Sequence, residues 1–138
     1  MSRPASLFHD PGSIPLPRRI PVYLAVGTAR LLTSQPPRRI RRVLARLGRG
    51  ARPATYEEAK AARDQVMAVS LTCAGREGCL SRSVASVLLC RLRGQQATWS
   101  VGVRRLPPLG AHAWVEVDKV PVDEGYPADY FRTFFTVP

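Results

Sequence analysis

The chain of 138 residues is long enough for one domain, and 45% of its residues are hydrophobic, which excludes disorder throughout. The formal net charge is +11, and arginine supplies nearly all of it, because Lys60 and Lys119 are the only lysines. A protein this basic could bind nucleic acid, an acidic peptide or an anionic membrane surface. Alternatively, the arginines only keep helix faces solvated. Arg30 interrupts the apolar stretch 22–32, so no membrane span is expected.

Residues 1–20 are rich in proline and lack apolar periodicity, so we predict an extended N-terminal lead-in. Within this segment, Arg18-Arg19 precedes an apolar stretch and weakly resembles an export signal, but no convincing cleavage site follows. The cysteines are odd in number and sparse, which is typical of reduced thiols. We therefore expect a cytoplasmic protein.

Residues 21–54 form a predicted basic helical segment. A first helix is expected to start near Pro21, a residue suited to the first helical position, and to end near Thr33. A second helix is predicted by apolar residues at helical spacing, with arginines between them: Ile40, Val43, Leu44 and Leu47. Its basic face either docks a partner, such as an acidic peptide segment, or is merely solvated.

Residues 55–138 form a predicted second segment that changes from helices to strands. Thr55 and Glu58 have the spacing of a capping box, and the helix they begin should run to about Cys73. A buried helix is predicted from Cys79 to Gly94, in which Cys90 is expected to be a core residue.

Alternating or β-branched segments follow as predicted strands at 98–103, 112–117, 120–122 and 131–137. They indicate an antiparallel meander, with Asp118-Lys119 as the turn between the second and third strands. Helices followed by a small antiparallel sheet predict an α+β fold.

The chemistry suggested by the residues centres on Cys79, because a thiol at a helix start is held as thiolate by the positive helix end. His112 is the candidate base, since His9, the other histidine, lies in the lead-in. A tight turn at Asp118-Lys119 would bring Asp123 to the histidine as third member, and a longer loop would bring Glu124. The strand register alone does not decide whether Asp123 or Glu124 is the third member.

Other interpretations of these residues compete with catalysis. A lone cysteine and a lone histidine also occur together by chance, in which case the chain is a non-catalytic module that binds an acidic peptide or partner protein. A zinc site from the three cysteines and His112 lacks the short paired spacing of zinc motifs.

Several motifs together resemble the transglutaminase-like B2 proteins of lasso-peptide biosynthesis. The matching segments, in the order of that family, are Glu77–Ser83, Val101–Val103, Ala111–Asp118 and Pro121–Glu124. The resemblance covers roughly residues 55–138 and implies a catalytic domain with a transglutaminase-like or papain-like cysteine protease fold.

The resemblance implies a leader peptidase that cuts a ribosomally made precursor peptide at the end of its leader. Cys79 matches the nucleophile, His112 the base, and Glu124 the acidic third member. The implied partners are the precursor, the leader-recognition protein B1 and the lasso cyclase, without nucleic acid. Acyl transfer to an amine is an alternative with the same triad, and neither reaction requires a cofactor.

Two departures from the family pattern affect the site. Lys119 stands where the family often has glycine, which predicts a longer loop than a tight turn and agrees with Glu124. No clear glutamine candidate stands upstream of Cys79 to serve as an oxyanion donor, as it does in papain-like proteases. The Cys79 N–H is therefore the expected donor, with the second donor unassigned.

Overall fold

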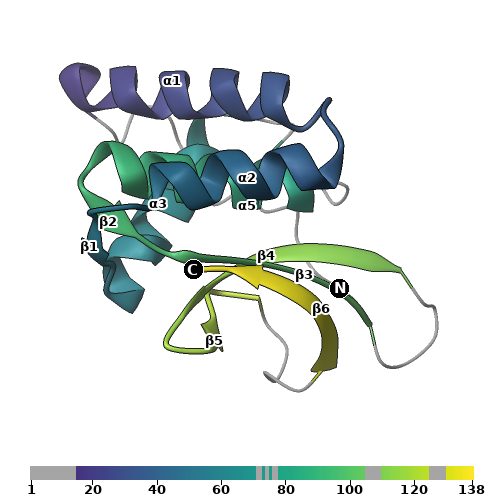
Figure 1. The fold of residues 1–138 in the computed structure, drawn as a ribbon. Helices are drawn as coiled ribbons and strands as arrows, with labels where there is room; N and C mark the ends of the chain where they lie inside the picture. The colour runs from purple at the N-terminus through teal and green to yellow at the C-terminus, as the bar shows by residue number, and fades with distance from the viewer. Residues whose placement is uncertain (1–14, 71–72, 74, 76–77, 105–109, 125–129) are drawn as a thin grey trace, which may run out of the picture.

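The computed structural model describes residues 15–70, 73, 75, 78–104, 110–124 and 130–138. The helices are α1 (Leu16–Leu32), α2 (Pro37–Leu47), α3 (Tyr56–Val69) and α5 (Cys79–Leu92). The strands are β1 (Arg52–Pro53), β2 (Gln95–Gln96), β3 (Thr98–Arg104), β4 (Ala111–Val117), β5 (Val120–Pro121) and β6 (Phe131–Val137). The helices lie on one face of the sheet, with α1 farthest from it (Figure 1). The fold is α+β, as predicted.

Helix α5 is the centre of the core. It contacts α1, α2, α3 and the strands β2 to β4, and its residues from Ser83 to Cys90 are all buried. Gly94 follows the helix with φ +75°, a left-handed conformation that suits glycine and ends the helix where predicted. Cys73 and Cys90 are buried in this core, as expected, with exposed fractions of 1% and 0%.

The first helix starts earlier than predicted. Helix α1 begins at Leu16, and Pro21 lies inside it rather than at its start. The missing N–H of Pro21 removes only one bond near the helix end, while burial of Val22, Ala25 and Ala29 against the core stabilises the helix. Residues 1–14 of the predicted lead-in lie outside the described residues.

Helix α3 begins as the sequence predicts. The Thr55 hydroxyl accepts the Glu58 N–H at 3.1 Å, and a Glu58 carboxylate oxygen accepts the Thr55 N–H at 3.0 Å, which is a capping box. The helix ends at Val69 rather than near Cys73. In the described part of the chain, no helix is long and apolar enough to cross a membrane.

The predicted strands all form, but their order differs from a simple meander. The four-stranded sheet has the order β5-β4-β3-β6, with antiparallel neighbours, so the last strand pairs with β3 instead of β5. The short β5 offers two residues for pairing, whereas β3 offers a full-length edge. A parallel pair, β1 with β2, was not predicted from sequence.

The turn between β4 and β5 is tight, contrary to the longer loop predicted from Lys119. Val117 pairs with Val120, so Asp118 and Lys119 form a two-residue turn. Both have positive φ, +50° and +65°, the backbone pattern of a type I′ hairpin turn, in which glycine is usually preferred. Lysine adopts this conformation here because the hairpin pairing on both sides requires it.

Candidate active site

Cys79 is the first residue of α5, preceded by Gly78 at the N-cap position. The helix start has no side-chain cap, so the N–H groups of its first turn face outward without a side-chain acceptor. The positive end of the helix dipole favours a negative charge at this position. Local structure therefore favours a thiolate at Cys79.

His112 on β4 is the direct partner of this thiol. A hydrogen bond with His112 lowers the pKa of Cys79, and the Ala113 N–H and the charge of His112 act in the same direction, while burial opposes them. The Ala113 N–H is available because the short β5 covers β4 only around Glu116 and Val117. A free stretch of strand edge thus receives the sulfur atom.

Glu124 binds the other side of the imidazole ring. Its Oε1 lies 3.1 Å from His112 Nε2, and the Glu124 side chain is only 7% exposed. Burial disfavours a charged His112, but its hydrogen bonds with Cys79 and Glu124 outweigh this and raise its pKa to about 9. Because Nε2 faces Glu124, Nδ1 is the nitrogen left to take the thiol proton.

Asp123, the alternative acid, points elsewhere. Pairing of β5 continues only as far as the Val122 N–H, which donates to the Val115 carbonyl. Asp123 then adopts a φ of +53°, and its N–H donates to the Tyr56 hydroxyl at 3.0 Å. This turn in the backbone brings the next side chain, Glu124, to the histidine. The tight hairpin and the Glu124 contact therefore coexist, which the register argument did not foresee.

Arg63 on α3 is a site residue that sequence reasoning missed. Its side chain is 11% exposed, and its two terminal nitrogens lie 3.4 Å from Asp123 Oδ2 and 3.8 Å from Glu124 Oε2. The arginine therefore lies within ion-pair distance of both acids and helps to hold Glu124 beside the ring. A sequence signal existed, because Arg63 falls on the helix face of the buried residues Ala59 and Val66.

An aromatic stack supports the histidine. The Phe131 ring on β6 lies nearly parallel to the His112 ring at 4.7 Å between centroids, and Trp114 stacks on Phe131 at 5.0 Å. Trp114 is 2% exposed, and its Nε1 donates to Glu116 Oε1 at 2.7 Å. Trp114 therefore packs inside the protein and, together with Phe131, supports the His112 ring.

Gly102 permits this stack, because it lies on β3 between the two strands that carry the rings. It pairs with His112 on one side and Thr133 on the other, next to an irregularity in the β3–β6 register. A Cβ atom at this position would lie 2.2 Å from the Arg132 carbonyl oxygen. The glycine thus allows the close approach of β6.

Arg82 and Ser83, adjacent to the cysteine motif, are structural. Arg82 Nη1 donates to the Cys73 carbonyl at 3.0 Å, fastening the segment before α5, and burial lowers its pKa. The Ser83 hydroxyl accepts the Trp99 indole N–H at 3.0 Å and joins α5 to β3. The described residues contain no cluster of three or more His, Cys, Asp or Glu side chains suited to a metal ion.

Comparison with known proteins agrees with this geometry. A family model described as Transglutaminase-like superfamily matches residues 22–136. No curated protein and no solved structure matches the chain. The family match includes most of α1 and all of α2, which carried no diagnostic motif, in addition to the chain from residue 55 to residue 136.

Proposed function

The chain belongs to the transglutaminase-like superfamily, whose members are generally cysteine-dependent enzymes, and we propose that it is a cysteine peptidase. The observation that carries the proposal is the hydrogen-bonded series of Cys79, His112 and Glu124 at the start of α5. A nucleophile, a base in contact with it and an acid that orients the base are the parts that acyl transfer requires.

In the proposed reaction, His112 takes the Cys79 proton and the thiolate attacks the carbonyl carbon of the scissile peptide bond. Glu124 orients the ring and stabilises the imidazolium. Collapse of the tetrahedral intermediate breaks the C–N bond, and His112 protonates the departing amine. Water then hydrolyses the thioester, releasing a carboxylate and restoring the thiol.

The N–H groups at the start of α5 are the proposed oxyanion donors. The developing negative charge on the carbonyl oxygen lies next to Cys79, where these amides and the helix dipole stabilise it. We propose the Cys79 N–H as the first donor, which is the donor that the sequence analysis predicted.

We further propose that the substrate is a lasso-peptide precursor, cut between leader and core, with a B1 protein presenting the leader in the cytoplasm. The resemblance of Glu77–Ser83 and Ala111–Asp118 to B2 proteins supports this substrate. Cleavage frees the amine of the core peptide, which a separate lasso cyclase would then join in a macrolactam.

The test is cleavage of a precursor in the presence of its B1 protein, followed by mass spectrometry of the products. Cys79→Ala should lower the cleavage rate by at least ~10³-fold, because it removes the nucleophile. Cys73→Ala, a matched change at a buried cysteine, should retain activity. Equal rates for Cys79→Ala and the unmodified enzyme would exclude the peptidase.

The same assay separates hydrolysis from acyl transfer. A primary amine added to the reaction competes with water for the thioester. The peptidase proposal predicts a leader fragment that ends in a free carboxylate even with the amine present. A leader fragment carrying the amine as its main product would assign the chain to the acyltransferases.

A further inference from the structure

Helix α2 carries a concentration of positive charge that the described part of the protein leaves unpaired. Its exposed arginines surround the buried Ile40 and Leu44, and the helix contains no acidic residue. The ion pairs among described residues involve Arg52, Lys60, Arg63 and His112. No described carboxylate neutralises the basic face of α2, which consists of Arg38, Arg39, Arg41, Arg42 and Arg46.

This basic face borders a groove. An open groove of about 370 Å³ lies between α2 and the end of β6, lined by Arg38, Arg41, Arg42, Thr136, Val137 and Pro138. The Arg41 guanidinium stacks over the Phe135 ring at 4.2 Å from its centroid, so the helix and the strand are held together beside the groove. We call this hollow the arginine groove.

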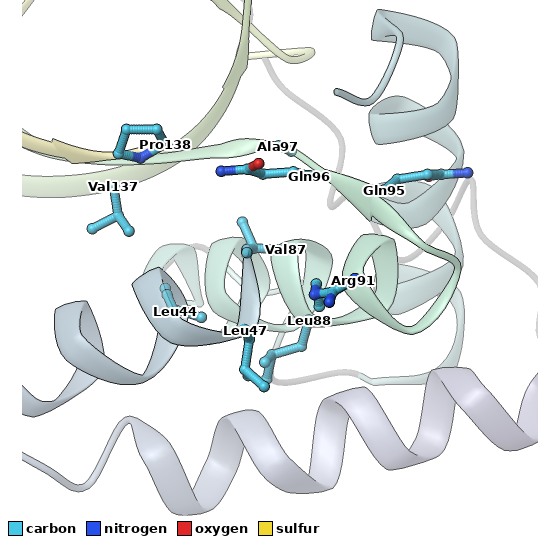
Figure 2. Close-up of a pocket in the computed structure, with 11 residues that line it drawn as sticks. Leu44, Leu47, Val87, Leu88, Arg91, Gln95, Gln96, Ala97, Val137 and Pro138 are labelled. Atoms are coloured by element: carbon cyan, nitrogen blue, oxygen red, sulfur yellow. The ribbon is translucent and has the colours of Figure 1, made fainter. Parts of the chain in front are cut away.

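The inner side of α2 packs on the core next to the arginine groove. Figure 2 shows a second, nearly closed space, with Val137 and Pro138 on one side and Leu44 of α2 and Val87 and Leu88 of α5 on others. The space enclosed there is only about 10 Å³, so no ligand larger than water enters beneath α2. The arginine groove is therefore an open surface hollow, with arginines of α2 along one wall and the end of β6 along the other.

Strand β6 connects the arginine groove with the active site. Its first residue, Phe131, stacks on His112, and its last residue, Val137, lines the groove. Seven strand residues span about 20 Å, from a rise of ~3.3 Å per residue. The strand is at the sheet edge, and no described strand pairs with its outer side, so its backbone groups are available to an extended chain.

We propose that the arginine groove binds an acidic, extended segment of the peptide substrate that lies outside the residues at the cleaved bond. The proposal rests on the peptidase function argued above. The arginines supply charge complementarity to Asp and Glu side chains, and the strand edge supplies partners for a peptide backbone. A peptide fits both features, whereas a nucleic acid would use only the charge.

Binding is tested by fluorescence anisotropy with a labelled hexaglutamate peptide and the full chain. The double variant Arg38→Glu plus Arg42→Glu should weaken binding at least about tenfold, because two attractive charges become repulsive. Arg18→Glu is the matched control, since Arg18 is also an exposed arginine in the first turn of a helix that contains an early proline. The control should change affinity less than about twofold.

Three results would overturn the arginine groove proposal. The first is that hexaglutamate binds the double variant as tightly as the unmodified chain, and the second is that Arg18→Glu loses as much affinity as the double variant. The third is that a labelled dodecathymidylate binds the unmodified chain more tightly than hexaglutamate does. The last result would assign the surface to nucleic acid. Circular dichroism of each variant excludes unfolding as the cause.

Cleavage kinetics test whether binding in the arginine groove contributes to cleavage at the active site. In a series of peptides with three glutamates at increasing distance from the cleaved bond, at least one should have a lower KM than the same peptide with three glutamines, and the double variant should abolish that difference. An unchanged KM difference in the double variant would contradict the proposal. Because Cys79→Ala abolishes cleavage but leaves the groove intact, it should bind hexaglutamate normally, so failure of the peptidase function and of the groove are distinguishable.

Discussion

Replacing Glu124 with glutamine isolates the contribution of the acid to the candidate site. The amide has the same shape and can still hydrogen-bond the ring, but it removes the negative charge 3.1 Å from His112 Nε2. The pKa of His112 is about 9 against an ordinary 6.5, which corresponds to roughly 3 kcal/mol in favour of the charged ring. The substitution should therefore lower that pKa markedly.

The magnitude follows from the two partners that hold the ring. This roughly 3 kcal/mol is the net effect of both partners against burial, so loss of the carboxylate removes on the order of 1 to 3 kcal/mol, or about 10- to 100-fold in the population of the thiolate–imidazolium pair. Poorer orientation of the ring adds to this loss. We expect kcat/KM for precursor cleavage to fall about 10- to 100-fold in Glu124→Gln.

Two assays read the effect, with Asp123→Asn as the matched control. Asp123 is the adjacent acid but turns toward Tyr56 and Arg63, so its amide variant should retain most activity. In Glu124→Gln the pKa of Cys79 should rise, because the neighbouring ring is less often charged, and alkylation of the thiol near pH 6 should slow. An equal or larger effect of Asp123→Asn on either assay would refute the assignment of Glu124.

Three further predictions concern two residues around the candidate site and the ion pair at the start of α3. Gly102→Ala should lower both the unfolding temperature and kcat/KM for cleavage, because the added Cβ would lie 2.2 Å from the Arg132 carbonyl oxygen. An unchanged unfolding temperature would contradict this prediction. Arg63→Gln should lower kcat/KM for cleavage, because Glu124 loses the neighbour 3.8 Å away that helps to hold it beside the histidine; an unchanged kcat/KM would contradict this positioning role. The hydrogen bond from Arg52 lowers the pKa of Glu58 from 4.5 to about 2, so ionised Glu58 stabilises the folded state above pH 4.5 and this stabilisation is lost as the pH falls toward 2. Glu58→Gln should therefore make the free energy of unfolding less dependent on pH between 4.5 and 2. Glu57→Gln is the control and should leave this pH dependence unchanged.

Local signals in the sequence were sufficient for most elements of the fold. The capping box at Thr55, the buried helix from Cys79 and the glycine stop at Gly94 depend on neighbouring residues, so composition and spacing identify them. The start of α1 at Leu16 was not predictable in this way. It depends on tertiary packing of residues such as Ala25, which overrides the local effect of proline.

The site was predictable in its residue types but not in its geometry. Cys79 and His112 stand out because one opens a helix and the other starts an alternating strand. The choice of acid depended on the backbone of Asp123, whose positive φ and bond to Tyr56 have no pattern in the sequence. Placement of β6 beside β3 likewise depends on long-range pairing, and with it the Phe131 stack on the histidine.

The central claim is that Cys79 forms a thioester with the leader part of the substrate. The most direct measurement is mass spectrometry of the enzyme quenched in acid during turnover, followed by peptide mapping, with Cys79→Ala measured in parallel. The account predicts an added leader acyl group on Cys79 in the unmodified chain, and neither adduct nor cleavage in the variant. An adduct on a different residue, or cleavage by Cys79→Ala at the unmodified rate, would contradict it.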